Sequence, residues 1–200
     1  MSNIEFNALQ LDALAEVGNI GAGNAATALS QLINKKVDMT VPSVNIVPFN
    51  DIFNRNDGEE LAVGVIVRVL GDTPGNILFV FDYDTANNMI ELLTGKREEE
   101  FTELGYSVLC EVGNIISGSY MNAIAKFTGL LIMASVPAVA YDMAGAILST
   151  TFMESEQFDD HVLDIETIFL NQDETKIGGH FYYVPKPGSL EKILNSLGIN

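Results

Sequence analysis

The side chains best suited to chemistry in this chain are a glutamate and an asparagine three residues apart, Glu16 and Asn19. On a helix this spacing puts both side chains on one face, with Asp12 one turn before them. A carboxylate beside a carboxamide can hold and orient a water molecule, or bridge a lysine and a phosphoryl oxygen. The pair supplies no nucleophile, hydride or metal of its own. It therefore indicates a site that binds and positions reacting groups.

The five residues around this pair return later in the chain. Residues 16–20 and residues 111–115 both read Glu-Val-Gly-Asn-Ile, at an offset of 95 positions (from 16 to 111), so that Glu111 and Asn114 repeat the pair. Without a gap, the same offset also aligns Asp12 with Ser107, Gly23 with Gly118, and Pro42 with Pro137. We infer an internal duplication, whose period is too long for a solenoid unit. A polar helix face that is merely solvated is free to drift after duplication, so the retained pair favours a function.

Both copies predict the same order of elements. Apolar residues at helical spacing predict long helices over residues 8–33 and about 103–127. In each copy two short strands around the proline, a β-hairpin and a closing helix follow. The predicted ranges are 37–41, 44–47, 61–70, 76–83 and 85–93, then 131–135, 138–141, 162–170, 177–184 and 190–197. The sequence predicts one α+β domain over residues 1–200, built of two repeats of about 8–95 and 103–198 with a common core.

The periodicity also predicts which side chains of the long helices are buried. The apolar stripe includes Gly18, Gly21, Ala28 and Leu32 on the first helix and Phe127 on the second. An interior glycine costs about 1 kcal/mol relative to alanine, and close packing of the two helices is the simplest reason for the glycines of the stripe. Asp12, Glu16, Asn19 and Gly23 lie on the opposite face. Small residues there, Gly23 beside Ala26, would let another macromolecule approach.

Composition and charge exclude several function classes. A formal net charge of −17 disfavours binding to nucleic acid and to anionic membranes. One cysteine, Cys110, and two histidines provide neither a disulfide framework nor zinc spacing, and we expect Cys110 to be a core residue. The sequence has no phosphate-binding loop, dinucleotide fingerprint or nucleophile-elbow serine. Residues 1–10 do not resemble a signal peptide, so we expect a cytoplasmic protein.

The second copy is about eight residues longer than the first. Pro42 and Ile90 are 48 positions apart, whereas Pro137 and the matching Ile193 are 56 apart. The extra residues lie between Tyr141 and residue 161. Residues 142–152 predict an additional helix there, with Asp142 near its N-cap.

The duplicated pattern resembles the signature of the CheC/CheX/FliY phosphatases of bacterial and archaeal chemotaxis. That signature is Asp or Ser, three residues, Glu, two residues, Asn, about 22 residues and Pro, and both copies contain it in full. The resemblance implies a fold in which the two long helices lie side by side on one face of a shared sheet, about a pseudo-twofold axis. It also implies dephosphorylation of the phospho-aspartate of the response regulator CheY, which supplies its own Mg²⁺ and lysine. The phosphatase would need no metal or cofactor of its own.

The resemblance assigns roles to the repeated residues. Glu16 and Glu111 would engage the receiver's lysine, and Asn19 and Asn114 would orient the water for in-line attack. The supporting residues would be Asp12, Ser107, Gly23, Gly118, Pro42 and Pro137, the two prolines by fixing a turn beneath each helix. The exchange of Asp12 for Ser107 leaves open whether the two sites are equally strong.

Some members of this family also bind the receptor deamidase CheD, and the resemblance implies such a partner for this chain. The extra helix offers a surface for such a partner, through Asp142, Ala144, Gly145, Ile147 and Leu148. The alternative, that Ile147 and Leu148 pack on the core, has equal support. Two other functions remain open: an adaptor that binds CheY or CheD without hydrolysis, and a structural part of the flagellar switch, which the lack of an added rotor-binding domain disfavours.

Overall fold

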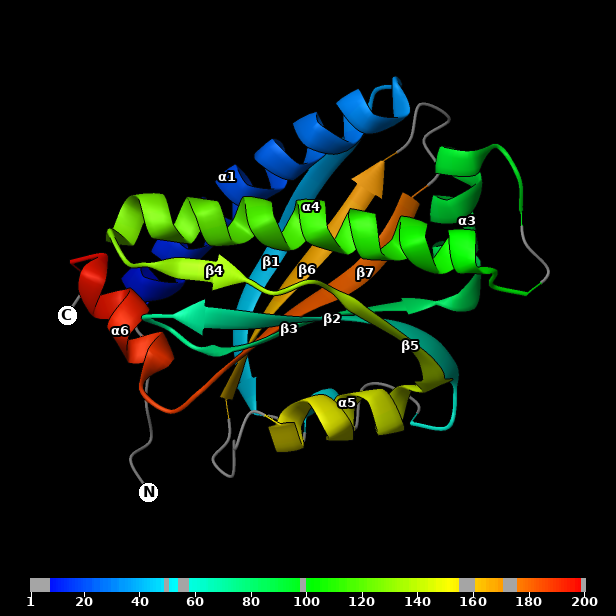
Figure 1. The fold of residues 1–200 in the computed structure, drawn as a ribbon. Coiled ribbons are helices and arrows are strands. Elements are labelled where there is room, and N and C mark those ends of the chain that lie inside the picture. Colours follow the sequence, from blue (N-terminus) through cyan, green and yellow to red (C-terminus); the bar gives the residue numbers. More distant parts are fainter. Residues whose placement is uncertain are drawn as a thin grey trace.

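The computed structural model of this chain describes residues 8–48, 51–53, 58–97, 100–154, 161–170 and 176–198. The first copy comprises five elements in chain order: helix α1 (Ala8–Ile33), strands β1 (Asp38–Pro48), β2 (Leu61–Gly71) and β3 (Gly75–Asp82), and helix α3 (Tyr83–Thr94). The second comprises seven: α4 (Glu103–Thr128), β4 (Ile132–Ala134), β5 (Ala138–Met143), α5 (Ala144–Glu154), β6 (His161–Leu170), β7 (Lys176–Pro185) and α6 (Ser189–Ser196). Figure 1 shows them around one sheet.

The sheet joins the two copies by exchanging their first strands. Its seven strands run in the order β1-β6-β7-β3-β2-β4, with β5 also paired to β2, and every pairing is antiparallel. Thus β1 of the first copy pairs with β6 of the second, while β4 and β5 of the second copy pair with β2 of the first. Strands β3 and β7 meet in the middle. The predicted shared sheet is confirmed, and neither copy contains all the partners of its own strands.

The main core lies between one face of the sheet and four helices. Helices α1 and α4 pack against each other there, with α3 and α6 at their flanks (Figure 1). Strand β3 is central and therefore buried on both faces: Ile77, Phe79 and Phe81 point into this core, whereas Leu78 and Val80 point to the other side. The predicted arrangement of the two long helices on one face is confirmed.

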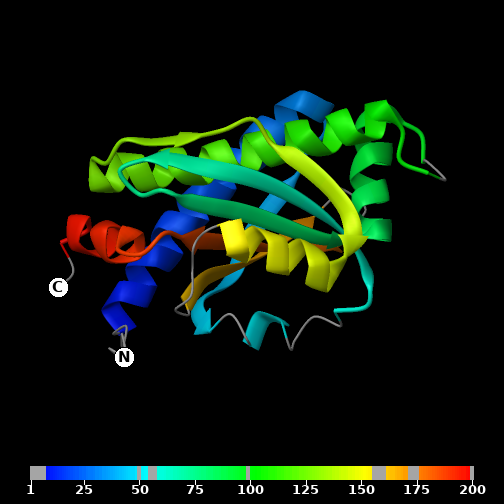
Figure 2. The ribbon, with the colours of Figure 1, turned by 60° about the horizontal axis from the view of Figure 1, so that its bottom comes forward.

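Helix α5 covers part of the opposite face of the sheet (Figure 2). Its Ile147, Leu148 and Phe152 side chains form a second core with Leu78 and Val80 of β3. A methyl group added at Gly64 of β2 would lie 2.6 Å from Cγ2 of Ile147, so the helix sits directly on the glycine. The extra helix of the second copy is thus a structural layer of the fold. In the first copy, one helical turn is described at the corresponding place, at residues 51–53.

Several predicted details are wrong. Residues 37–47 do not form two strands around a turn, because β1 runs without interruption through Pro42 and absorbs the proline in a β-bulge. Leu32 and Phe127 are exposed, and Ala26 is buried. Toward the C-terminal end of each long helix, the buried side chains are therefore not the ones that the periodicity predicts. Helix α5 begins at Ala144 rather than at residue 142.

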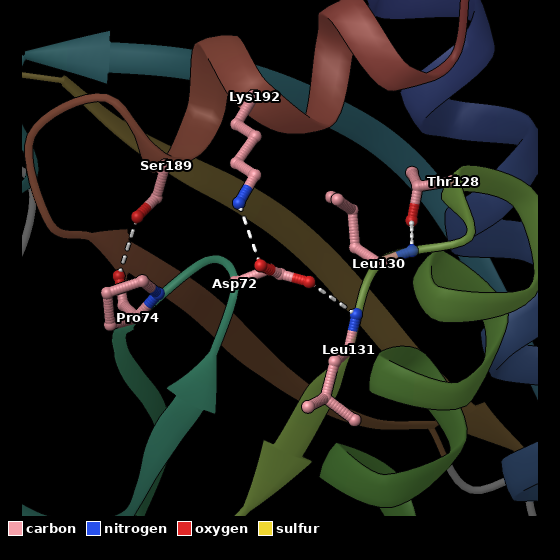
Figure 3. A network of polar contacts seen from close by, with 7 residues as sticks. All are labelled: Asp72, Pro74, Thr128, Leu130, Leu131, Ser189 and Lys192. Atoms are coloured by element: carbon pink, nitrogen blue, oxygen red, sulfur yellow. Dashed lines mark hydrogen bonds and ion pairs between the residues drawn. The ribbon is translucent and has the colours of Figure 1, made fainter.

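The turn between β2 and β3 joins three elements of the fold (Figure 3). Asp72 accepts hydrogen bonds from Nζ of Lys192 on α6 (2.9 Å) and from the backbone N–H of Leu131 after α4 (2.9 Å). Next to it, the hydroxyl of Ser189 donates to the carbonyl of Pro74 (2.9 Å). The Lys192 contact, more than the Leu131 N–H, lowers the pKa of Asp72 below its ordinary value. This turn fixes the C-terminal end of α4 relative to α6.

Candidate functional site

Helix α1 presents the first Glu-Asn pair to solvent. Glu16 and Asn19 lie on its outer face and are both exposed, while their neighbours Leu14 and Val17 are buried in the main core. Asp12 and Gly23 are exposed as well, as the periodicity predicts. An amphipathic helix packed on a sheet leaves its polar face free in this way. The carboxylate and the carboxamide are therefore accessible to another molecule.

Helix α4 repeats this arrangement with the second pair. Glu111 and Asn114 are exposed, and Val112 is buried between them. Ser107, one turn earlier, is also exposed, and its hydroxyl donates a hydrogen bond to the carbonyl of Glu103 in the preceding turn (2.8 Å). Ser107 thus stands where Asp12 stands on α1, but it carries no charge. The two polar faces are alike in their Glu and Asn and differ at this position.

The glycines of the two helices have different neighbours. A Cβ at Gly21 would lie 2.8 Å from Cδ1 and 3.1 Å from Cα of Tyr120, so this glycine allows α1 and α4 to touch, as predicted. Gly18 and Gly113 instead face the sheet. A Cβ at Gly113 would lie 2.5 Å from Cγ1 of Val65, so this glycine allows α4 to approach the sheet, whereas a Cβ at Gly18 would make ordinary contacts at 3.7–3.8 Å. Nothing lies within 4 Å of a Cβ at Gly23 or Gly118. No neighbouring atom of the chain therefore requires a glycine at either position, and the helix surface beside each motif is open.

Beneath each motif helix, the valine and proline of the repeat form a β-bulge. In β1, Thr40 pairs with Ile168 and Ser43 with Glu166, so two residues oppose one. In the second copy, the N–H of Ser135 donates to the carbonyl of Arg68, and Ala138 pairs with Ile66. The two residues between Ser135 and Ala138 therefore oppose the single residue between Ile66 and Arg68. Pro42 and Pro137 therefore occupy bulges, which tolerate a residue without an N–H. The predicted turn beneath each helix is a bulge in both copies.

Different residues of the two bulges face the motif helices. At the first site, Cγ1 of Val41 lies 3.8 Å from a Cβ built on Gly18, and Val41 packs against the main core. At the second site, Cβ of Pro137 takes this place, 3.9 Å from a Cβ on Gly113. Val136, the counterpart of Val41, is 87% exposed. The two valines of the repeat thus have opposite orientations in the two copies.

The surface beside Glu111 and Asn114 is hollowed into a groove of about 470 Å³. One wall is the exposed face of α4, and the other is the segment from the end of β4 through the bulge. Its lining residues are Tyr106, Ser107, Cys110, Glu111, Asn114, Ala134, Ser135, Val136 and Pro137. The groove therefore combines the motif of the second copy with an apolar rim.

Cys110 belongs to this groove rather than to the core, contrary to the prediction. Its side chain is partly exposed, and its thiol contacts the carbonyl oxygen of Pro137 at 3.7 Å. Partial burial raises the pKa of the Cys110 thiol, which favours the neutral form. The thiol links the helix wall of the groove to its bulge wall.

The residues of α5 that we expected to bind a partner are mostly buried. Ala144, Gly145, Ile147 and Leu148 all lie in the interior, because their side of the helix packs on the sheet. Asp142 is exposed, but it lies in β5, where its carboxylate accepts a hydrogen bond from the N–H of Met143 (2.8 Å). The expectation that these small and apolar side chains are available to a partner is corrected for all except Asp142.

Sequence reasoning missed Tyr106, Ser135 and Val136, which line the groove. Their types gave no signal, since a tyrosine, a serine and a valine are common everywhere, and Val136 matches Val41 in the repeat. In the part of the chain that the structure describes, no three His, Cys, Asp or Glu side chains gather as a metal site would require. Among the same residues, no helix is both long enough and apolar enough to span a membrane.

Comparison with known proteins agrees with this geometry. The sequence profile of the CheC-like family matches residues 9–46 and 104–141, the same 95-residue offset as the repeat. Over 196 residues, or 94% of each chain, the sequence is 36% identical to the Bacillus subtilis strain 168 protein named CheY-P phosphatase CheC. The chain belongs to the CheC-like family. It is also 30% identical, over 68% of this chain and 36% of the other, to the flagellar motor switch phosphatase FliY of the same organism.

Solved structures of other proteins support the fold of this CheC-like chain. The crystal structure of Thermotoga maritima FliY superimposes with a TM-score of 0.81 at 23% identity, covering 98% of both chains. A chain of the FliM-SpeE complex from H. pylori gives a TM-score of 0.73 at 14% identity, covering 97% of both. At these identities the likeness concerns the fold alone. It confirms the duplicated α+β architecture.

Proposed function

We propose that this chain is a phosphatase that hydrolyses the phospho-aspartate of a CheY-type response regulator in chemotaxis signalling. The observation that carries the proposal is the solvent-facing position of both Glu-Asn pairs on two helices whose other faces are buried. Membership of the CheC-like family and the phosphatase names of two relatives support it. The proposed substrate is an intracellular receiver, so the proposed place of action is the cytoplasm.

In this proposal the repeated residues share the work between binding and water positioning. Glu16 and Glu111 engage the lysine near the receiver's phosphoryl group, and Asn19 and Asn114 orient a water molecule for in-line attack. The receiver supplies the Mg²⁺, and this chain needs no metal or cofactor. Phosphoryl transfer depends mainly on positioning and charge stabilisation. A carboxylate and a carboxamide on a rigid helix are sufficient for that purpose.

The decay of a phosphorylated CheY-type receiver in the presence of Mg²⁺ tests the proposal. The wild-type chain should accelerate the decay, and a variant with both Asn19→Ala and Asn114→Ala should not. Asn24→Ala with Asn122→Ala is a matched control, because both asparagines are exposed on the same two helices but outside the motifs. The control should retain the wild-type rate.

Two other outcomes would redirect the proposal. A wild-type chain that binds the receiver without accelerating decay would be an adaptor, and the Glu and Asn side chains would be binding contacts. Equal activity in the double Asn variant and the control would contradict the water-positioning role. A binding titration run beside the decay assay separates these outcomes.

We also propose that the surface around α5 binds a CheD-type receptor deamidase. Support comes from the exposed side chains next to the buried ones: Asp142 and Met143 at the end of β5, and Met153 on α5. A calorimetric titration with such a deamidase should show binding that Met143→Glu with Met153→Glu weakens. Unchanged affinity in this variant would place the deamidase elsewhere.

A further inference from the structure

We infer that Val136 is the apolar contact through which the second site binds its receiver, and that this contact makes the second site the stronger of the two. The inference rests on the proposed function and adds to it a residue outside the repeated motif. Of the large hydrophobic side chains that the structure describes as exposed, Val136 is the most exposed, at 87%. It lies on the same groove as Glu111 and Asn114. Any molecule that reaches those two side chains along the groove meets Val136.

The bulge directs Val136 outward in a fixed position. Ser135 binds the backbone of Arg68 on β2 twice: its N–H donates to the Arg68 carbonyl, and its hydroxyl accepts from the Arg68 N–H, both at 2.9 Å. On the other side of the bulge, β5 pairs with β2 from Ala138 onward. Bulges redirect side chains in this manner. Both ends of the short segment are therefore anchored, and the valine needs little reordering on binding.

The opposite wall of the groove is equally well held. Tyr106, on the first turns of α4, packs edge-on against Phe101 with ring centroids 5.9 Å apart. Phe101 in turn contacts Tyr141 of β5 (5.4 Å) and Tyr83 of α3 (4.9 Å). This aromatic cluster connects α4 to β5, the strand that follows the bulge wall. A preformed groove loses less free energy on binding than one that must be ordered.

The first site has no equivalent contact at this position. Its counterpart, Val41, packs against the main core beside Gly18. The space beside Gly113 is instead shared by Pro137 and by Val65 of the neighbouring strand, whose Cγ1 would lie 2.5 Å from a Cβ on the glycine. Because these two residues fill the space, Val136 points to solvent. Val41 therefore packs within the fold, whereas its counterpart Val136 is accessible to a partner.

The test measures KM and kcat for a phosphorylated receiver in an Asn19→Ala background, where the second site does the turnover. Val136→Asp should raise KM about tenfold, the scale of a central interface contact, with kcat and melting temperature unchanged. Val136→Thr, similar in shape but polar, should raise KM less, and Val136→Ile should leave it unchanged. Leu9→Asp, at an exposed apolar residue in the first turn of α1, is the matched control and should have no effect.

The first site provides the opposite background. In an Asn114→Ala chain, where only the first site turns over, Val136→Asp should not change KM. An unchanged KM in the Asn19→Ala background, with a wild-type chain that is active, would overturn the role of Val136 and leave the proposed function intact. If the chain binds a receiver without hydrolysis, the same variants in a binding titration decide the question. No binding and no hydrolysis with a cognate receiver would remove both proposals.

Discussion

The two motif sites have the same glutamate and asparagine side chains but different surroundings. On α1 the motif lies above a bulge whose valine is packed inward, whereas on α4 it lies beside a groove whose valine points outward. The carboxylate Asp12 precedes the first motif, and the neutral Ser107 precedes the second. Duplication preserved the groups that would act on a phosphoryl group. The residues around them have diverged, which gives each site its own binding surface.

The largest difference should appear when each water-positioning asparagine is removed alone. Loss of one preorganised hydrogen-bonding side chain typically lowers the rate at its own site by about a hundredfold or more, so the remaining activity reports the other site. We expect Asn114→Ala to remove most of the acceleration of receiver dephosphorylation and Asn19→Ala to remove the smaller part. The decay of a phosphorylated receiver measures both. Equal losses would show that the groove gives the second site no advantage.

Two glycine substitutions on α1 should have opposite effects on stability. Gly21 lies at the contact between α1 and α4, and Gly23 lies on the exposed face beside the first motif. Gly21→Ala should lower the free energy of unfolding by about 1–3 kcal/mol, because the added methyl group clashes with Tyr120, including its backbone. Gly23→Ala meets no atom within 4 Å and should raise the free energy of unfolding by about 1 kcal/mol through helix propensity. Urea denaturation measures both. A stabilising Gly21→Ala would contradict the close contact of the two helices.

The anchoring of the second bulge should affect only the second site. Ser135→Ala removes the hydroxyl that accepts from the Arg68 N–H and should cost about 1 kcal/mol of stability. It should also raise KM in the Asn19→Ala background, since Val136 is then less firmly placed. Ser149 on α5, which is partly exposed like Ser135, provides the control, Ser149→Ala. If KM rises equally in the Asn114→Ala background, the bulge does not act locally.

The smallest expected effect concerns the turn that fixes the end of α4 and depends on pH. In the folded chain the Lys192 contact and the Leu131 N–H lower the pKa of Asp72 below its ordinary value of 3.8. The carboxylate therefore stabilises the fold above that value, and the contribution disappears as the pH falls through the folded-state pKa. Asp72→Asn should lower the melting temperature at neutral pH and not in strong acid.

Removal of the lysine provides the control for this prediction. Lys192→Met should reproduce the main part of the effect, because the Lys192 hydrogen bond is the largest cause of the lowered pKa of Asp72. Adding Asp72→Asn to Lys192→Met should then change the melting temperature little. A melting-temperature difference that persists in acid would show that the Asp72 carboxylate is not responsible.

Much of the fold could be predicted from local patterns. Helices α1 and α4 follow from apolar spacing, and strands β3 and β7 from short apolar runs between turns, since these patterns depend on neighbours in the chain. The outward direction of Glu16 and Asn19 follows from the same periodicity. Near the helix ends the pattern was less reliable: Leu32 and Phe127 belong to the stripe by type, yet both are exposed. Periodicity predicts the inward face of a helix, whereas the extent to which that face is covered depends on the neighbouring elements.

The candidate site divides in the same way. Repetition of the five-residue motif was sufficient to choose Glu16, Asn19, Glu111 and Asn114, because a duplicated chain can be compared with itself. It could not identify Val136, whose counterpart Val41 has the same type and the same place in the repeat. Sequence reasoning also left open whether Ile147 and Leu148 bind a partner or pack on the core, because their burial depends on the sheet face that α5 covers.

The sequence by itself determined the duplication, the helices and their polar faces, because each depends on residue order and local periodicity. Only the tertiary structure decided that the copies exchange their first strands, since antiparallel pairing between distant segments leaves no local signal. It also decided which residue of each Val-Pro bulge faces its helix. That choice depends on how the space beside Gly18 and Gly113 is filled, by Val41 and Val44 in one copy and by Val65 and Pro137 in the other.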